Sequence, residues 1–171
     1  DDPQNIAAAK ARIQAAGLLG SRISLYLRSP SSTGAPAMFA DLVVSKSSIS
    51  SSETLNISEE LLTEARRLQR PYGGMICLGN PLSENAIIEE RGELPDAGSW
   101  THQYADPANT VCSGDEIVRG RLTMNWFRDI DFPTPSRHGR GPSPLYEDGL
   151  LIYEGLDGLI AVNAYNGREL W

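Results

Sequence analysis

The chain has 171 residues, of which 40% are apolar and 22% charged, and this composition excludes a wholly disordered protein. No stretch of the sequence reaches the roughly 20 apolar residues that a membrane-spanning helix needs, so we expect no membrane span. The net charge of −7 disfavours nucleic-acid binding, because phosphates are met by surfaces rich in Lys and Arg.

The charge is divided unevenly along the chain. Residues 1–80 contain 8 Lys or Arg and 7 Asp or Glu, a net charge of +1, whereas residues 81–171 contain 7 and 15, a net charge of −8. Such a change of composition favours two regions of different structure. We therefore expect a first region at 1–80, a connection at 81–99 and a second region at 100–171.

The first predicted element is a helix that begins at Asp2 and Pro3. An Asp side chain accepts hydrogen bonds from the free backbone N–H groups, and Pro suits the first helical position. Gly17 offers a left-handed end, and the apolar positions recur at helical spacing: Ile6, Ala9, Ile13 and Ala16. Residues 22–28, RISLYLR, then alternate apolar and polar side chains as a strand with one covered face does.

Three further elements and a loop follow in the first region. Residues 39–45, FADLVVS, predict a strand buried on both faces, and the serine-rich residues 45–52 predict an exposed loop. Asn56 and Glu59 form a capping-box-like start for a second helix. Its apolar positions are Leu61, Leu62, Ala65 and Leu68. Residues 75–78, MICL, predict another buried strand, and this alternation of helices and strands favours an α/β sheet.

Three segments of this region resemble, in order, the second half of a class I methyltransferase domain. They read DPQNIAAAKARIQAAGL, FADLVVS and EELLTEARRLQRPYGGMICLG. The resemblance implies a partial Rossmann-like sheet, and it makes Ser29 a candidate contact for the adenine of S-adenosylmethionine. The glycine-rich loop and the ribose-binding acidic residue of that family would precede Asp1, so we expect no cofactor to bind to these residues alone.

The second region is typical of short strands joined by tight turns. Its turn dipeptides are spaced nine residues apart, at 148–149, 157–158 and 166–167, and they separate the apolar runs LLIYEGL and LIAVNAY. Asp-Gly and Asn-Gly favour hairpins because both residues tolerate positive φ. Evenly spaced hairpins predict a β-meander, the unit of a propeller blade or a barrel.

This meander resembles the repeat of pyrroloquinoline-quinone-type β-propellers, which ends in a pattern like A-x-D-x-x-T-G-x-x-x-W. The pattern falls here on Ala161, Asn163, Asn166, Gly167 and Trp171, with Asn at the Asp and Thr positions. Residues 99–127 resemble the segment that precedes the first blade of quinoprotein-like propellers, with Trp100 and Trp126 at matching places. Together they are similar to large propeller proteins of planctomycete type. The resemblance implies an all-β second region in which Trp171 stacks on a neighbouring blade.

One dense polar cluster stands out as a candidate ligand contact, namely Arg137, His138 and Arg140. Two guanidinium groups and an imidazole can hold an anionic ligand. The interpretation that we favour is that they pair with the acidic side chains of Asp129, Asp131 and Glu147 and order their own loop.

Cys77 and Cys112 lack metal-ligand spacing, so we predict free thiols and no metal site. The two histidines lie in unrelated loops and allow no Ser-His-Asp arrangement, so we predict no catalytic residue.

Together these resemblances predict a piece of a larger protein, with a partial α/β sheet followed by the opening segment and first blade of a propeller. The function we expect is that of a binding or interaction scaffold. Its partners would be the remaining blades, the missing first strands and a protein. One alternative is part of a quinone-dependent dehydrogenase, with pyrroloquinoline quinone and calcium in later blades; the other is part of an S-adenosylmethionine-dependent methyltransferase. The first two imply a place outside the cytoplasm, such as the periplasm, and the third implies the cytoplasm.

Overall fold

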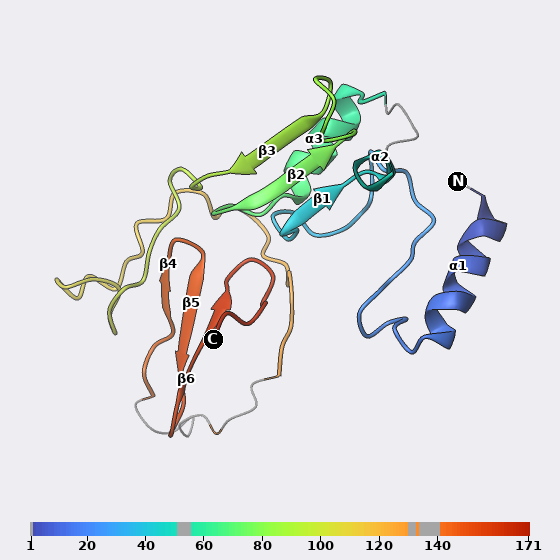
Figure 1. The fold of residues 1–171 in the computed structure, drawn as a ribbon. Coiled ribbons are helices and arrows are strands. Elements are labelled where there is room, and N and C mark those ends of the chain that lie inside the picture. Colours follow the sequence, from blue (N-terminus) through green and yellow to red (C-terminus); the bar gives the residue numbers. More distant parts are fainter. Residues whose placement is uncertain (1, 51–55, 130–132, 134–140) are drawn as a thin grey trace. The chain divides into compact units, whose positions relative to one another are not determined.

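A computed structural model describes residues 2–50, 56–129, 133 and 141–171 of the chain (Figure 1). Contacts between residues divide the chain into two compact units, Asp1–Gly34 and Ala35–Trp171. Both β-sheets belong to the second unit. Among the helices of these described ranges, none has the length and apolar character that crossing a bilayer requires.

The first unit is built on one helix, α1, which spans Pro3–Ala15. As predicted, the Asp2 side chain caps it by accepting a hydrogen bond from the backbone N–H of Gln4 at 2.9 Å. Gly17 follows the helix with a φ of 69°, which confirms the predicted left-handed end. The predicted apolar stripe is the least exposed side of α1, although no residue of the helix is fully buried.

The strand predicted at residues 22–28 is wrong. Ile23 forms only an isolated bridge with Leu19, and residues 24–28 have no regular structure. Alternation gives a segment two faces, but a strand also needs a neighbour that bonds its backbone N–H and C=O groups. The described part of this unit contains no second strand that could supply them.

The first sheet of the second unit has the strand order β1-β2-β3. β1 (Leu42–Val44) and β2 (Gly74–Leu78) run parallel, and α3 (Glu59–Leu68) lies between them in the chain. Parallel neighbours need such a crossover connection, because a tight hairpin joins only antiparallel strands. The α/β character predicted for this part of the chain is therefore confirmed.

The core of this sheet lies between α3 and β2. Leu62 and Ala65 on the helix form a buried cluster with Ile76 and Leu78 on the strand. α3 begins two residues later than predicted, because Ser58 rather than Asn56 is its cap. The Ser58 hydroxyl accepts a hydrogen bond from the backbone N–H of Leu61 at 3.3 Å. The apolar spacing located the buried face of the helix correctly, whereas the choice of cap was wrong.

Two predictions around β1 are also wrong. β1 lies at the edge of the sheet, so Leu42 and Val44 are 57% and 44% exposed instead of buried on both faces. The serine-rich segment forms a short helix, α2 (Lys46–Ile49), in place of the predicted loop. Ser47 is buried there, and the Ser48 hydroxyl donates to the backbone oxygen of Cys77 at 2.6 Å. Residues 51–52 of that predicted loop lie outside the described ranges.

A strand lies within the connection predicted at residues 81–99. β3 (Ile87–Arg91) pairs antiparallel with β2 along its whole length. The buried Gln69 holds the two strands from the end of α3, since its amide donates to the backbone oxygens of Gly74 at 2.8 Å and Glu89 at 3.1 Å. Only two of the five β3 residues are apolar, which explains why periodicity did not indicate this strand.

The second sheet is the predicted β-meander, which this structure confirms. It consists of β4 (Leu145–Glu147), β5 (Leu150–Glu154) and β6 (Leu159–Asn163), each antiparallel to the next. Asp148 and Gly149 form the first turn with φ values of 49° and 78°, as a two-residue hairpin requires. The second turn is longer and is closed by a hydrogen bond from Gly155 N to Gly158 O at 2.8 Å.

Each edge of the meander carries a further short pairing. Trp100 and Tyr146 exchange two backbone hydrogen bonds of 2.7 and 2.8 Å beside β4. Beside β6, the backbone N–H of Asn163 donates to Arg168 at 2.8 Å, and that of Ala161 donates to Trp171 at 2.9 Å. The described residues thus form a small mixed α/β structure with two three-stranded sheets, while the larger sheet and the ring of blades remain predictions.

Candidate functional site

A hollowed surface of the meander lies on one face of β4–β6. The strand register places Leu145, Ile152 and Ala161 side by side on this face, with Leu150 and Leu159 beyond them. Two hollows of about 220 Å³ and about 130 Å³ occur there, and both are lined by Thr101, Leu145 and Ile152. We refer to these two adjoining hollows as the meander groove. Its floor is apolar, and it is open to solvent.

Residues 101–103 form a polar wall of the meander groove. The Gln103 side chain fixes this wall against the segment before β4, because its oxygen accepts from the backbone N–H of Ser143 at 2.7 Å. The Thr101 hydroxyl lies 2.9 Å from Nδ1 of His102. At the two ends of the groove the lining includes the carboxylates of Glu147 and Glu154. The groove therefore combines an apolar floor with acidic ends.

The opposite face of the meander is covered by Trp126. Its indole N–H donates to the backbone oxygen of Ala164 at 2.8 Å. Gly167 has a φ of 70°, and a Cβ atom placed there would lie 2.5 Å from the Trp126 ring. The segment around Trp126 has no regular secondary structure. It is anchored to the meander by this indole and by Arg128, which donates to the backbone oxygen of Gly167 at 3.4 Å and pairs with Glu169.

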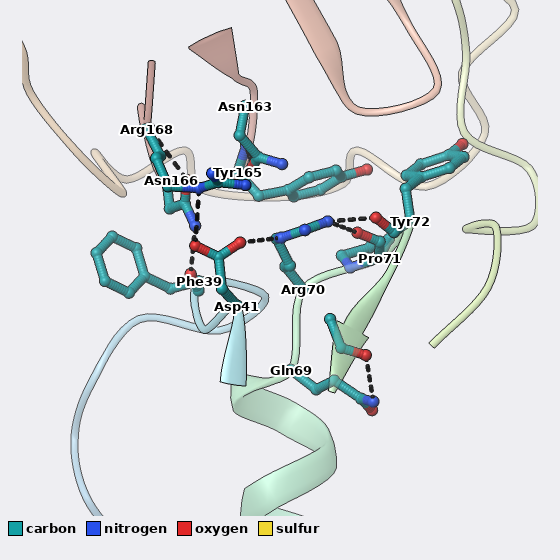
Figure 2. A network of polar contacts seen from close by, with 11 residues as sticks. Phe39, Asp41, Gln69, Arg70, Pro71, Tyr72, Asn163, Tyr165, Asn166 and Arg168 are labelled. Carbon is teal, nitrogen blue, oxygen red and sulfur yellow. Dashed lines mark hydrogen bonds and ion pairs between the residues drawn. The ribbon is translucent and has the colours of Figure 1, made fainter. Parts of the chain in front are cut away.

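Asp41, just before β1, joins the two sheets of the second unit. Figure 2 shows its carboxylate between the guanidinium groups of Arg70 and Arg168. Arg70 Nε donates to one oxygen, and Arg168 Nε lies 3.1 Å from the other. The Asn166 amide adds a further link by donating to the backbone oxygen of Phe39 at 3.1 Å. Because both Asp41 oxygens are engaged by cations, the residue serves as a structural link between the two sheets.

Three tyrosines lie beside this link. The rings of Tyr72 and Tyr165 are stacked with centroids 6.3 Å apart, and the hydroxyls of Tyr146 and Tyr165 lie 3.2 Å apart. Burial raises the pKa of Tyr165, and the hydrogen bond with Tyr146 raises it further. Burial also raises the pKa of Tyr72. Both phenols therefore stay neutral at physiological pH, which suits packing rather than proton transfer.

The candidate residues from the sequence are dispersed. Ser29 is exposed in the first unit, where its hydroxyl lies 2.9 Å from that of Ser31. The ligand candidates Arg137, His138 and Arg140 lie outside the described residues. Of the propeller-motif residues, Trp126 and Gly167 pack against each other, and Trp100 pairs with Tyr146 as described above. Trp171 is exposed, and its proposed stacking on a neighbouring blade remains a prediction.

The cysteines and the acidic side chains of the described residues lie apart from one another. Within the described ranges, no three His, Cys, Asp or Glu side chains come together in a way that could hold a metal ion. Cys77 is half-buried in β2 and Cys112 is exposed, and both are free thiols, as predicted. The predicted absence of cofactors in these residues remains a prediction.

The meander groove itself was missed at the sequence level, although its signal is present. Residues at every second position from Leu150 to Glu154 read Leu, Ile, Glu, and the facing strand reads Leu145 then Glu147. This alternation places apolar side chains in the middle of one sheet face and carboxylates at its ends. The contribution of residues 101–103 had no local signal, because it depends on the pairing of Trp100 with Tyr146.

Function has to be inferred from the groove and its surroundings. Its donors, acceptors and apolar floor are suited to binding a ligand or a partner. Comparison with protein-family models, with curated proteins and with solved structures finds no significant match to this chain.

Proposed function

We propose that this chain is part of a quinoprotein-like β-propeller protein and acts as a binding scaffold, with no reaction catalysed by its own residues. The open apolar groove on the meander is the observation that carries the proposal. The floor residue Leu159 is 58% exposed, although it lies in a regular strand beside buried residues of β6. Apolar side chains gathered on one face of a regular sheet and edged by polar groups support a role in binding.

The architecture around the groove supports a scaffold. The meander is held from both edges by backbone pairings, and Trp126 covers the face opposite the groove. Asp41 ties the meander to the other sheet through Arg168. A binding surface mounted on such connected elements keeps its shape before a partner arrives, which lowers the entropic cost of binding.

The proposal is tested with the whole chain in two measurements. Titration calorimetry is used with pyrroloquinoline quinone plus Ca²⁺, and separately with S-adenosylmethionine. We expect no heat of binding and no dye-linked oxidation of alcohols, because the residues of this chain are proposed to bind a partner and to catalyse no reaction. Tight quinone binding with alcohol oxidation, or tight binding of S-adenosylmethionine with methyl transfer, would overturn the proposal.

The second measurement tests the groove as an accessible apolar surface. Nile red, a neutral dye that fluoresces in apolar surroundings, is compared on the native chain and on Leu159→Ser. We expect weaker dye fluorescence for Leu159→Ser and no change for the control Leu82→Ser, because Leu82 is exposed outside the meander. Equal dye binding by all three proteins would remove the observation on which the proposal depends.

A further inference from the structure

We infer that Asn166 is a deamidation site that the folded turn protects, and that its conversion to aspartate loosens the link between the two sheets of the second unit. This inference is independent of the proposed scaffold function. It follows from the residue after Asn166, from the contacts that hold the turn around it and from the place of its amide in the link (Figure 2).

The reactivity of Asn166 comes from the residue that follows it. Among all the asparagines of the chain, Asn166 alone precedes a glycine. In deamidation, the backbone nitrogen of the following residue attacks the carbonyl carbon of the Asn side chain. Because Gly167 has no Cβ, it hinders this approach least and allows the backbone the widest range of conformations. The sequence therefore makes this the most reactive asparagine of the unfolded chain.

The reaction needs only water from outside the chain. The Gly167 nitrogen loses its proton and forms a bond to the side-chain carbonyl carbon of Asn166, while the bond from that carbon to Nδ2 breaks. Nδ2 leaves as ammonia and takes up the proton, and a cyclic imide remains. Water then adds to one of the two imide carbonyl carbons and breaks its bond to the Gly167 nitrogen. Addition at the side-chain carbon gives aspartate, and addition at the backbone carbon gives isoaspartate.

The folded turn opposes this attack at both reacting groups. The Gly167 N–H donates to the backbone oxygen of Asn163 at 2.8 Å, so the attacking nitrogen is already engaged. Gly167 is also buried beneath the ring of Trp126, which limits its movement. The Asn166 side chain is held at both ends, because Oδ1 accepts from the backbone N–H of Arg168 at 3.1 Å and Nδ2 donates to Phe39 at 3.1 Å. These contacts have to open before the ring can close.

The product of deamidation disturbs the link between the sheets. The Asn166 amide donates to the backbone oxygen of Phe39, two residues before Asp41. A carboxylate at position 166 has no proton to donate, so its oxygen would face the Phe39 oxygen as a second acceptor. It would also compete with Asp41 for the guanidinium of Arg168. Isoaspartate adds a further backbone atom to the turn and displaces Gly167. Both products therefore weaken the attachment of the meander to the first sheet.

The protection is tested by the rate at which Asn166 loses its amide at neutral pH. Proteolytic digestion and mass spectrometry follow this loss in the whole chain and in a free peptide of residues 164–170. We expect the folded chain to react at least about tenfold more slowly than the peptide, because several hydrogen bonds must first open. Equal rates in the chain and the peptide would overturn the inference.

A matched pair of variants tests whether the link controls this rate. Arg168 and Arg66 are both about half exposed and each forms an ion pair, but Arg66 lies on α3 and pairs with Glu89. We expect Arg168→Gln to deamidate about threefold faster than the native chain, because the turn loses its attachment to Asp41. Arg66→Gln should deamidate at the native rate. Equal rates in the two variants would overturn the inference, and circular dichroism verifies that both are folded.

The effect of the product is tested with Asn166→Asp. The control is Asn85→Asp, which adds the same charge in the exposed turn between β2 and β3. We expect Asn166→Asp to lower the midpoint of urea denaturation and Asn85→Asp to leave it close to the native value. A midpoint for Asn166→Asp that equals that of Asn85→Asp would show that the Asn166 amide contributes nothing to the link, and would overturn the inference.

Discussion

At the scale of single residues, Asp41 stands between two arginines in very different surroundings. The Arg70 side chain is only 11% exposed, whereas that of Arg168 is 54% exposed. A largely buried guanidinium needs a counter-charge, because leaving it unpaired incurs the desolvation cost of the ion. An exposed ion pair is screened by water and contributes little. The contact of Asp41 with Arg70 therefore contributes more to the free energy of unfolding than its contact with Arg168.

Substitutions of Asp41 and of Arg168 measure the two contributions separately. Asp41→Asn should lower the free energy of unfolding by about 2 kcal/mol, because it removes the negative charge from the buried Arg70. Arg168→Gln, which removes only the exposed partner, should lower it by less than about 1 kcal/mol. Urea denaturation at neutral pH measures both values. Equal losses for the two variants would show that the burial of Arg70 does not decide the energetics.

At the scale of elements, α3 is attached to β3 by side chains as well as to β2 by the core. The guanidinium of Arg66 donates to both oxygens of Glu89, at 2.9 and 2.6 Å. This paired hydrogen bond lowers the pKa of Glu89, and the positive charge of Arg66 adds to the effect. A carboxyl group whose pKa is depressed by folding stabilises the fold above its unfolded pKa. That contribution is lost as the pH falls through the folded value.

The pH dependence of stability therefore isolates this contact. We expect Glu89→Gln to be less stable than the native chain at neutral pH. The difference should shrink as the pH falls below about 4.3, the pKa of an unperturbed Glu, and through the depressed pKa of the folded Glu89. Thermal unfolding followed by circular dichroism over this range measures it, with Glu84→Gln as the control for loss of an unpaired charge. A difference that stays constant or grows in acid would contradict the assignment.

The elements also show which parts of the fold are encoded locally. Asp2-Pro3, the helical spacing of Leu62 and Ala65, and Asp148-Gly149 act within a few residues, so α1, α3 and the first hairpin could be predicted. The strand at β1 was predicted, but its exposure depends on its neighbours, because Leu42 has no described strand beyond it. α2 and β3 also depend on distant partners, as the bond from Ser48 to Cys77 shows. Pairing of this kind leaves little trace in a local pattern, and the groove wall at residues 101–103 was missed for the same reason.

At the scale of the whole molecule, the division of the chain falls between Gly34 and Ala35. The sequence predicts a connection at 81–99, where the change of charge occurs, yet those residues contain β3. Both sheets lie in one unit, with the buried core around Ile76 and the link through Asp41. The second unit thus contains its own core and its own sheet pairings, which are the requirements for folding by itself.

Removal of residues 1–34 tests this independence. We expect the remaining residues 35–171 to unfold with a free energy within about 0.5 kcal/mol of that of the whole chain, because the buried core around Ile76 and both sheets lie within them. The control is a chain that ends at Ala164, which removes Arg168 and the pairing beside β6 and should be clearly less stable. Chemical denaturation of the three proteins gives the comparison. A large loss on removing residues 1–34 would contradict the division into units.

Because Trp126 packs on Gly167, a substitution at one of these positions affects which substitutions the other tolerates. Two separate requirements keep Gly167 without a side chain, the positive φ and the indole ring above it. A smaller residue at position 126 removes the steric requirement but leaves the backbone requirement in place. A side chain therefore becomes acceptable at position 167 only after the indole has gone and the turn has been rebuilt. Replacing Gly167 therefore requires changes in the turn as well as at position 126, and neither substitution is neutral when it occurs alone.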